Sequence, residues 1–161
     1  MAPPRFPRVT LHVLCTVAAL ALSGCKDNSN GAQPGRTAGE VAYGRRCETC
    51  HQSEGQGSGT SWPPLAGSPW LLRDHETPIR IVLLGLQGEI AVNGARFFNT
   101  MPNQGVVMSD REIAEVLTFA RGAWGNAADP ILEAEVTAVR ASLAGRSTAW
   151  TARELEALRA K

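Results

Sequence analysis

The stretch Cys47-Glu48-Thr49-Cys50-His51 decides how the rest of this chain is interpreted. Two thiols separated by one helical turn, with an imidazole directly after them, can serve three kinds of chemistry. They can form a reactive dithiol, contribute to a zinc site, or attach a c-type haem. The surrounding residues discriminate between these three possibilities.

Haem attachment fits the stretch best. Both thiols can bond to the two vinyl groups of one porphyrin, and His51 then lies beneath the iron as an axial ligand. A redox-active dithiol normally follows a strand of a βαβ unit, and no such strand precedes Cys47. A zinc site needs a fourth ligand, for which His75 is a poor candidate. We therefore expect one covalent haem c at Cys47, Cys50 and His51, with dithiol and zinc chemistry as alternatives.

A low-spin electron carrier also needs a second axial ligand on the other face of the iron. Met101 stands before Pro102 in an expected loop, from which its thioether can point inward. Met108 adjoins an expected helix start and is more typical of core packing, while His75 lies in a charged stretch. We expect Met101 to be the ligand; Met108, His75 and an open sixth site are the alternatives.

The N-terminus carries the pattern of an export signal. Arg5 and Arg8 precede a mainly apolar run over residues 9–22, and Leu22-Ser23-Gly24-Cys25 resembles a bacterial lipobox. We expect residues 1–24 to be a lipoprotein signal peptide and Cys25 to be lipidated. Residues 25–37 are polar and rich in Gly, Pro and Asn, which is typical of a flexible linker.

Composition limits the remaining possibilities. The chain has 161 residues, 43% of them apolar and 19% charged, which suits one modest globular domain with additional segments. The formal charge is +1, and removal of Arg5 and Arg8 leaves 14 basic against 15 acidic residues. This balance gives no basic surface for nucleic acid. No apolar stretch long enough for a transmembrane helix follows the signal, so we expect a membrane tether through the lipid alone.

Helices dominate the predicted secondary structure. Apolar spacing and capping residues predict helices over residues 38–49, from Thr77-Pro78 to Gly88, and from a capping box at Ser109 and Glu112 to Gly122. Asn93-Gly94 between two short apolar runs predicts a hairpin. Two further helices are expected in the tail, over residues 132–143 and after a cap formed by Thr151 and Glu154.

Together these pieces resemble a class I, mitochondrial-type monohaem cytochrome c domain, closest to the cytochrome lipoproteins and subunits of periplasmic quinoprotein dehydrogenases. The resemblance implies an all-α fold of three to five helices around one haem, with a short hairpin, over residues 38–126, and a helical extension over residues 127–161. The matching residues are Gly39, Tyr43, Cys47-Glu48-Thr49-Cys50-His51, Trp62-Pro63-Pro64-Leu65-Ala66-Gly67-Ser68-Pro69, Val92-Asn93-Gly94, Met101-Pro102, Ser109-Asp110-Arg111-Glu112-Ile113-Ala114 and Trp124-Gly125-Asn126.

The resemblance also implies roles for three residues outside the haem motif. Gly39 would let the first helix cross the helix around residues 117–120. The backbone carbonyl of Pro64 would orient His51 through its other ring nitrogen, and Leu65 would pack on the porphyrin.

The function implied is electron transfer rather than catalysis. Such a protein, on the periplasmic side of a bacterial membrane, would pass single electrons from a periplasmic dehydrogenase to a downstream respiratory acceptor. Its partners would be other redox proteins. The alternatives are a haem sensor or enzyme with an open sixth site, and a thiol–disulfide oxidoreductase.

Overall fold

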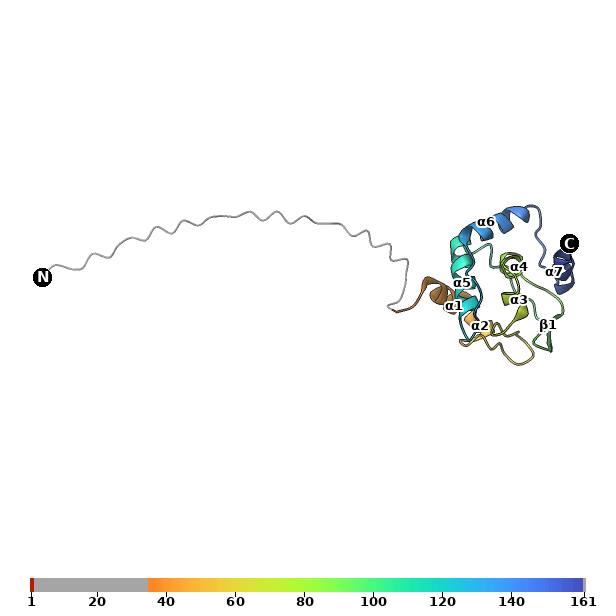
Figure 1. The fold of residues 1–161 in the computed structure, drawn as a ribbon, viewed down its shortest axis with the longest axis horizontal. Coiled ribbons are helices and arrows are strands. Elements are labelled where there is room, and N and C mark those ends of the chain that lie inside the picture. Colours follow the sequence, from red (N-terminus) through yellow and green to blue (C-terminus); the bar gives the residue numbers. More distant parts are fainter. Residues whose placement is uncertain (2–34, 161) are drawn as a thin grey trace.

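The computed structural model describes residues 1 and 35–160, which hold seven helices and one two-stranded hairpin (Figure 1). The predicted signal peptide, Cys25 and most of the predicted linker lie outside the described residues. The fold is therefore helical, as expected. Within residues 35–160, no helix is long and apolar enough to cross a membrane. The elements are α1 (Ala38–Arg46), α2 (Glu48–His51), α3 (Pro69–Leu72), α4 (Glu76–Leu84), β1 (Ile90–Val92), β2 (Ala95–Phe97), α5 (Asp110–Gly122), α6 (Glu133–Ser142) and α7 (Ala152–Arg159).

Helices α1 and α5 cross closely at Gly39. A Cβ atom on Gly39 would lie 2.1 Å from the backbone oxygen of Glu115 and 2.9 Å from the Cβ of Phe119. This confirms that a glycine is needed at the crossing, although the closest approach begins at Glu115, before the expected stretch. The rings of Tyr43, Phe119 and Trp124 fill the adjoining space, with centroids 4.9–5.5 Å apart.

Gly39→Ala should lower the free energy of unfolding by about 1–3 kcal/mol or more, because two backbones would have to separate to admit one methyl group. Denaturant unfolding of the haem-loaded protein measures the effect. Gly44→Ala in the same helix is the matched control, since its Cβ would meet only the flexible end of Glu48, at 3.3 Å. It should be neutral or stabilising, as alanine is the better helix former. An equal loss in both variants would contradict a special role for Gly39.

The first predicted helix is interrupted at Cys47. Residues 38–49 were expected to form one helix, but α1 ends at Arg46 and α2 begins at Glu48. The amide of Cys47 still donates to the carbonyl of Tyr43, at 2.8 Å, while Cys47 opens the next turn. The interruption gives the haem motif a helical turn of its own.

Helix α4 differs from the prediction at both ends. It begins at Glu76, with His75 rather than Thr77 at the N-cap position, and the carboxylate of Asp74 accepts from both the amide and the hydroxyl of Thr77. The helix ends before Gly85, not at Gly88. Leu86, expected on the helix, therefore belongs to the following loop.

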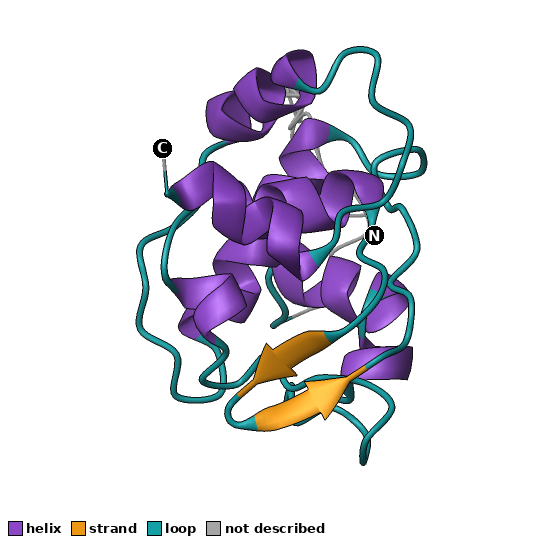
Figure 2. Ribbon diagram, turned by 90° about the vertical axis from the view of Figure 1, so that its right-hand side faces the viewer, coloured by secondary structure: helices purple, strands orange, loops and turns teal. Residues whose placement is uncertain are grey.

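The hairpin and the start of α5 are as predicted. Strands β1 and β2 pair antiparallel around Asn93 and Gly94, both at positive φ (Figure 2). At α5, the hydroxyl of Ser109 accepts from the amide of Glu112, whose carboxylate accepts from the Ser109 amide. Both signals are local in sequence, which is why they could be read directly.

The C-terminal extension packs into the core of the molecule. Helix α6 lies against α4 and α5 (Figure 1). Helix α7 packs through Leu155 into the apolar cluster that also contains residues of the hairpin. Val136 of α6 and Leu155 of α7 are almost completely buried, at 0% and 1% exposure. Both predicted tail helices are confirmed, and Thr151 and Glu154 form the expected cap of α7.

Candidate haem site

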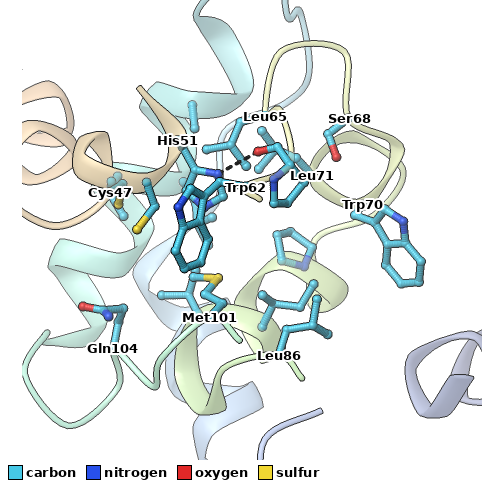
Figure 3. A pocket seen from close by; sticks show the side chains of 18 of the residues that line it. Cys47, His51, Trp62, Leu65, Ser68, Trp70, Leu71, Leu86, Met101 and Gln104 are labelled. Carbon is cyan, nitrogen blue, oxygen red and sulfur yellow. Dashed lines mark hydrogen bonds between the residues drawn. The ribbon is translucent and has the colours of Figure 1, made fainter. Parts of the chain in front are cut away.

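A mainly apolar pocket lies between α2, α4, α5, the hairpin and the loop that follows it (Figure 3). Its empty space amounts to about 1180 Å³ when the open solvent at its mouth is included. All six pocket residues named from the sequence line it. These residues are Cys47, Cys50, His51, Pro64, Leu65 and Met101.

His51 presents one ring nitrogen to the pocket. Its side chain is largely buried, and Nδ1 lies 2.9 Å from the backbone oxygen of Pro63. A carbonyl can only accept a hydrogen bond, so Nδ1 carries the proton and Nε2 keeps its lone pair. Burial lowers the pKa of His51 despite the opposing effect of the Pro63 carbonyl. The imidazole is thus held neutral and oriented, which is the form that binds a metal.

The carbonyl that orients His51 belongs to Pro63, not to Pro64 as predicted. Pro64 lines the pocket beside Leu65. Both prolines lack an amide proton and both offer a carbonyl, so the residue types alone cannot tell which oxygen faces the ring. The direction of the loop backbone decides the question.

The two cysteines are held on one turn without being joined to each other. Cys47 and Cys50 are free thiols, and the amide of His51 donates to the carbonyl of Cys47 at 2.9 Å. Burial, with a smaller contribution from Cys50, raises the pKa of Cys47 to about 11. Reactive dithiols depend instead on a lowered thiol pKa. The environment of Cys47 therefore disfavours dithiol exchange as its function.

Met101 reaches the pocket from the loop between β2 and α5. In Figure 3 it enters from the side of the pocket opposite to His51. Met108 also lines the pocket, but it is buried within the core cluster of α4, α5 and α6. His75 does not line the pocket; its Nδ1 lies 2.8 Å from a carboxylate oxygen of Glu135. This placement favours Met101 among the three candidates.

The donor groups fit a covalently bound haem. Two thiols, an imidazole with an available nitrogen and a thioether surround a slot whose other walls are mainly apolar. Among the described residues, no three His, Cys, Asp or Glu side chains gather as a metal site. A porphyrin matches this arrangement because it supplies four nitrogen ligands itself and leaves two axial positions to the protein.

Fold and site together define a c-type cytochrome domain. The model of the cytochrome c family matches residues 37–124, more than half of the chain, and the chain belongs to this family. Its cofactor is accordingly haem c, one for the single domain.

Several curated proteins are similar in sequence. The cytochrome c subunit of the quinone alcohol dehydrogenase of Gluconobacter oxydans is 34% identical over 113 residues, covering 70% of this chain and 24% of that subunit. Cytochrome c-552 of Thermus thermophilus is 40% identical over 86 residues, covering 51% of this chain and 65% of that protein. The gluconate 2-dehydrogenase cytochrome c subunit of Pantoea cypripedii is 36% identical over 105 residues, covering 60% and 22%. The chain thus spans about a quarter of the dehydrogenase subunits.

Sequence reasoning missed several residues that shape the site. Trp70 lines the pocket, and its Nε1 donates to the carbonyl of Ala91 at 2.8 Å, fixing the ring beside the hairpin. Ser68 and Gln104 also contribute to the lining. Ser68 belongs to the Trp62–Pro69 stretch of the resemblance, but no local motif marks Trp70 or Gln104, because their positions follow from contacts between segments far apart in the chain.

Proposed function

We propose that this chain is an exported monohaem electron carrier with Cys47 and Cys50 bonded to the haem and His51 and Met101 as its axial ligands. The observation that carries the proposal is the placement of an oriented imidazole and a thioether on opposite sides of one apolar slot (Figure 3). His/Met ligation favours Fe(II) and so gives the haem a raised reduction potential.

The protein's own residues make electron transfer the favoured use of such a site. Pro63 fixes His51, and mainly apolar residues surround the candidate ligands. With Met101 bound, no axial position remains for a substrate or a signalling gas. Trp62, half-buried at the pocket, adds apolar surface to its lining. Transient redox partners dock through small interfaces, and a small exposed surface at the mouth of the pocket is enough for such contact.

Carbon monoxide added to the reduced, haem-loaded chain at neutral pH tests this function. A carrier with Met101 bound should leave the absorption spectrum unchanged on mixing. Rapid formation of a carbonyl spectrum would instead show an open sixth site and support a sensor or an enzyme. The ferric protein should also show the weak red charge-transfer band of thioether ligation.

We infer further that the electron donor is a periplasmic dehydrogenase and that the acceptor is a downstream respiratory component. The similarity to subunits of the quinone alcohol and gluconate dehydrogenases supports this choice of partner. The chain spans less than a quarter of those subunits, so it would correspond to one haem domain of such an assembly.

From the signal pattern of residues 1–25 we propose that a lipid on Cys25 anchors the protein on the periplasmic side of a membrane. Cys25→Ser should move the haem-containing protein from the membrane fraction to the soluble fraction, because one acylated residue supplies the attachment. Cell fractionation with detection of haem measures the change. Ser23→Ala, which keeps the cysteine and a small residue before it, is the control and should remain with the membrane. Membrane retention of the Cys25→Ser variant would contradict lipidation at this position.

A further inference from the structure

Met101 is carried by a loop that needs external support. Residues 98–109 connect β2 to α5 without forming a helix or a strand, and such segments are the most mobile parts of a fold. Within this loop, the backbone of Met101 pairs with Leu86: the Leu86 amide donates to Met101 at 3.0 Å, and the Met101 amide donates back at 2.9 Å. The position of Met101 therefore depends on what holds Leu86.

The close pairing also depends on the residue before Leu86. Gly85 has a φ of +81°, and a Cβ there would lie 2.4 Å from the backbone oxygen of Met101. A glycine thus allows the end of α4 to approach the Met101 backbone directly.

Trp150 of the C-terminal extension holds the other side of Leu86. The amide of Gln87 donates to the Trp150 carbonyl at 2.8 Å, and the Trp150 amide donates to the carbonyl of Gly85 at 3.0 Å. Leu86 is therefore the middle of three paired segments, with Met101 on one side and Trp150 on the other. Their side chains meet in one apolar cluster, in which Trp150 is 5% exposed. The guanidinium of Arg146 covers the indole at 3.7 Å.

Arg140 of α6 holds the later part of the same loop. Its guanidinium donates to the carbonyls of Gly105, at 2.8 Å, and Met108, at 3.2 Å. Its Nε donates to the carboxylate of Asp110, the first residue of α5, at 2.6 Å. One side chain of the extension thus joins three points between the loop and the following helix.

We propose that Trp150 and Arg140 are positioning residues that keep Met101 in the pocket, so that the C-terminal extension controls how firmly the sixth ligand is held. The inference rests on the proposed assignment of Met101 as that ligand. Without the indole of Trp150, this segment would lose the buried side chain that anchors it in the apolar cluster, and its backbone pairing beside Leu86 would be held less firmly. Without Arg140, two carbonyls of the loop and the carboxylate of Asp110 in α5 would lose their common donor.

Imidazole binding to the ferric, haem-loaded full chain tests the proposal. Imidazole can bind only when Met101 has left, so its apparent affinity reports the fraction of molecules with the ligand detached. Trp150→Ala should bind imidazole about tenfold more tightly, because alanine keeps the backbone hydrogen bonds of residue 150 but removes the buried indole that packs with Leu86 and Met101. Arg140→Gln should change the affinity in the same direction.

Two control variants separate positioning from general stability. Leu158→Ala changes an apolar residue of α7 that is 40% exposed, and it should leave imidazole affinity unchanged. Ile113→Val removes one methyl from a fully buried site in α5; it should lower unfolding stability but not loosen Met101. If Ile113→Val strengthened imidazole binding as much as Trp150→Ala, the positioning role would be refuted.

Trp150→Phe covers the case in which Trp150→Ala does not fold. The indole Nε1 has no hydrogen-bond partner, so phenylalanine keeps the backbone pairing and most of the packing. It should give a smaller increase in affinity of the same sign. If folded Trp150→Phe and Arg140→Gln variants bound imidazole with wild-type affinity, the positioning role would be overturned, and the proposed function would still stand. If the wild-type ferric protein lacked the thioether band, the proposed function itself would be overturned.

Discussion

Met101→Ala should abolish the thioether charge-transfer band of the ferric protein and open the reduced protein to carbon monoxide. Loss of the thioether should also lower the reduction potential by more than about 0.1 V, on a scale where axial ligands set haem potentials over about 0.8 V. Absorption spectroscopy and a potentiometric titration measure these changes. The domain should still fold, because Met101 is only partly buried at the margin of its apolar cluster.

Met108→Leu is the matched control for this experiment. Met108 is a buried core residue that also lines the pocket, and leucine nearly conserves its volume, at a cost below about 1.5 kcal/mol. The variant should keep the thioether band, the potential and the resistance to carbon monoxide. The reverse pattern, with the band lost in Met108→Leu and retained in Met101→Ala, would transfer the ligand assignment to Met108.

Features set by local chemistry could be predicted from the sequence. The spacing of Cys47, Cys50 and His51 specifies the haem motif, Asn93-Gly94 specifies the hairpin, and Ser109 with Glu112 specifies the start of α5. In each case the interacting groups lie within a few residues of one another. The pattern therefore contains the whole physical argument.

Features set by contacts between distant segments could not be predicted. The sequence placed Leu86 on a helix, whereas its backbone pairs with Met101 and Trp150. Periodicity describes one element at a time, so it contains no information about which segment lies beside it.

The tail illustrates the same limit on a larger scale. Its helices were predicted correctly from caps and apolar spacing. No pattern showed that Arg140 would reach the carbonyls of Gly105 and Met108. The helices of an extension can therefore be predicted while its relation to the haem site cannot.

Replacing both Cys47 and Cys50 by alanine should have an all-or-none effect on haem retention. After denaturation, the wild-type chain should keep its haem through electrophoresis and acidic solvent extraction, because thioether bonds survive both. The double variant should release all of it. Each single variant should retain one bond and so keep its haem under the same treatment. Haem staining and the mass of the intact polypeptide measure the outcome.

Cys25→Ser provides the control for this last experiment, because it removes a cysteine outside the haem motif and should leave covalent haem unchanged. The result also decides between the two chemistries open to a pair of thiols. Burial raises the pKa of Cys47 to about 11, which keeps a free thiol protonated at neutral pH and makes it a poor nucleophile for exchange. A wild-type protein isolated colourless from a haem-competent host, with Cys47 and Cys50 cycling between dithiol and disulfide, would contradict haem attachment, since each sulfur can form only one of the two bonds.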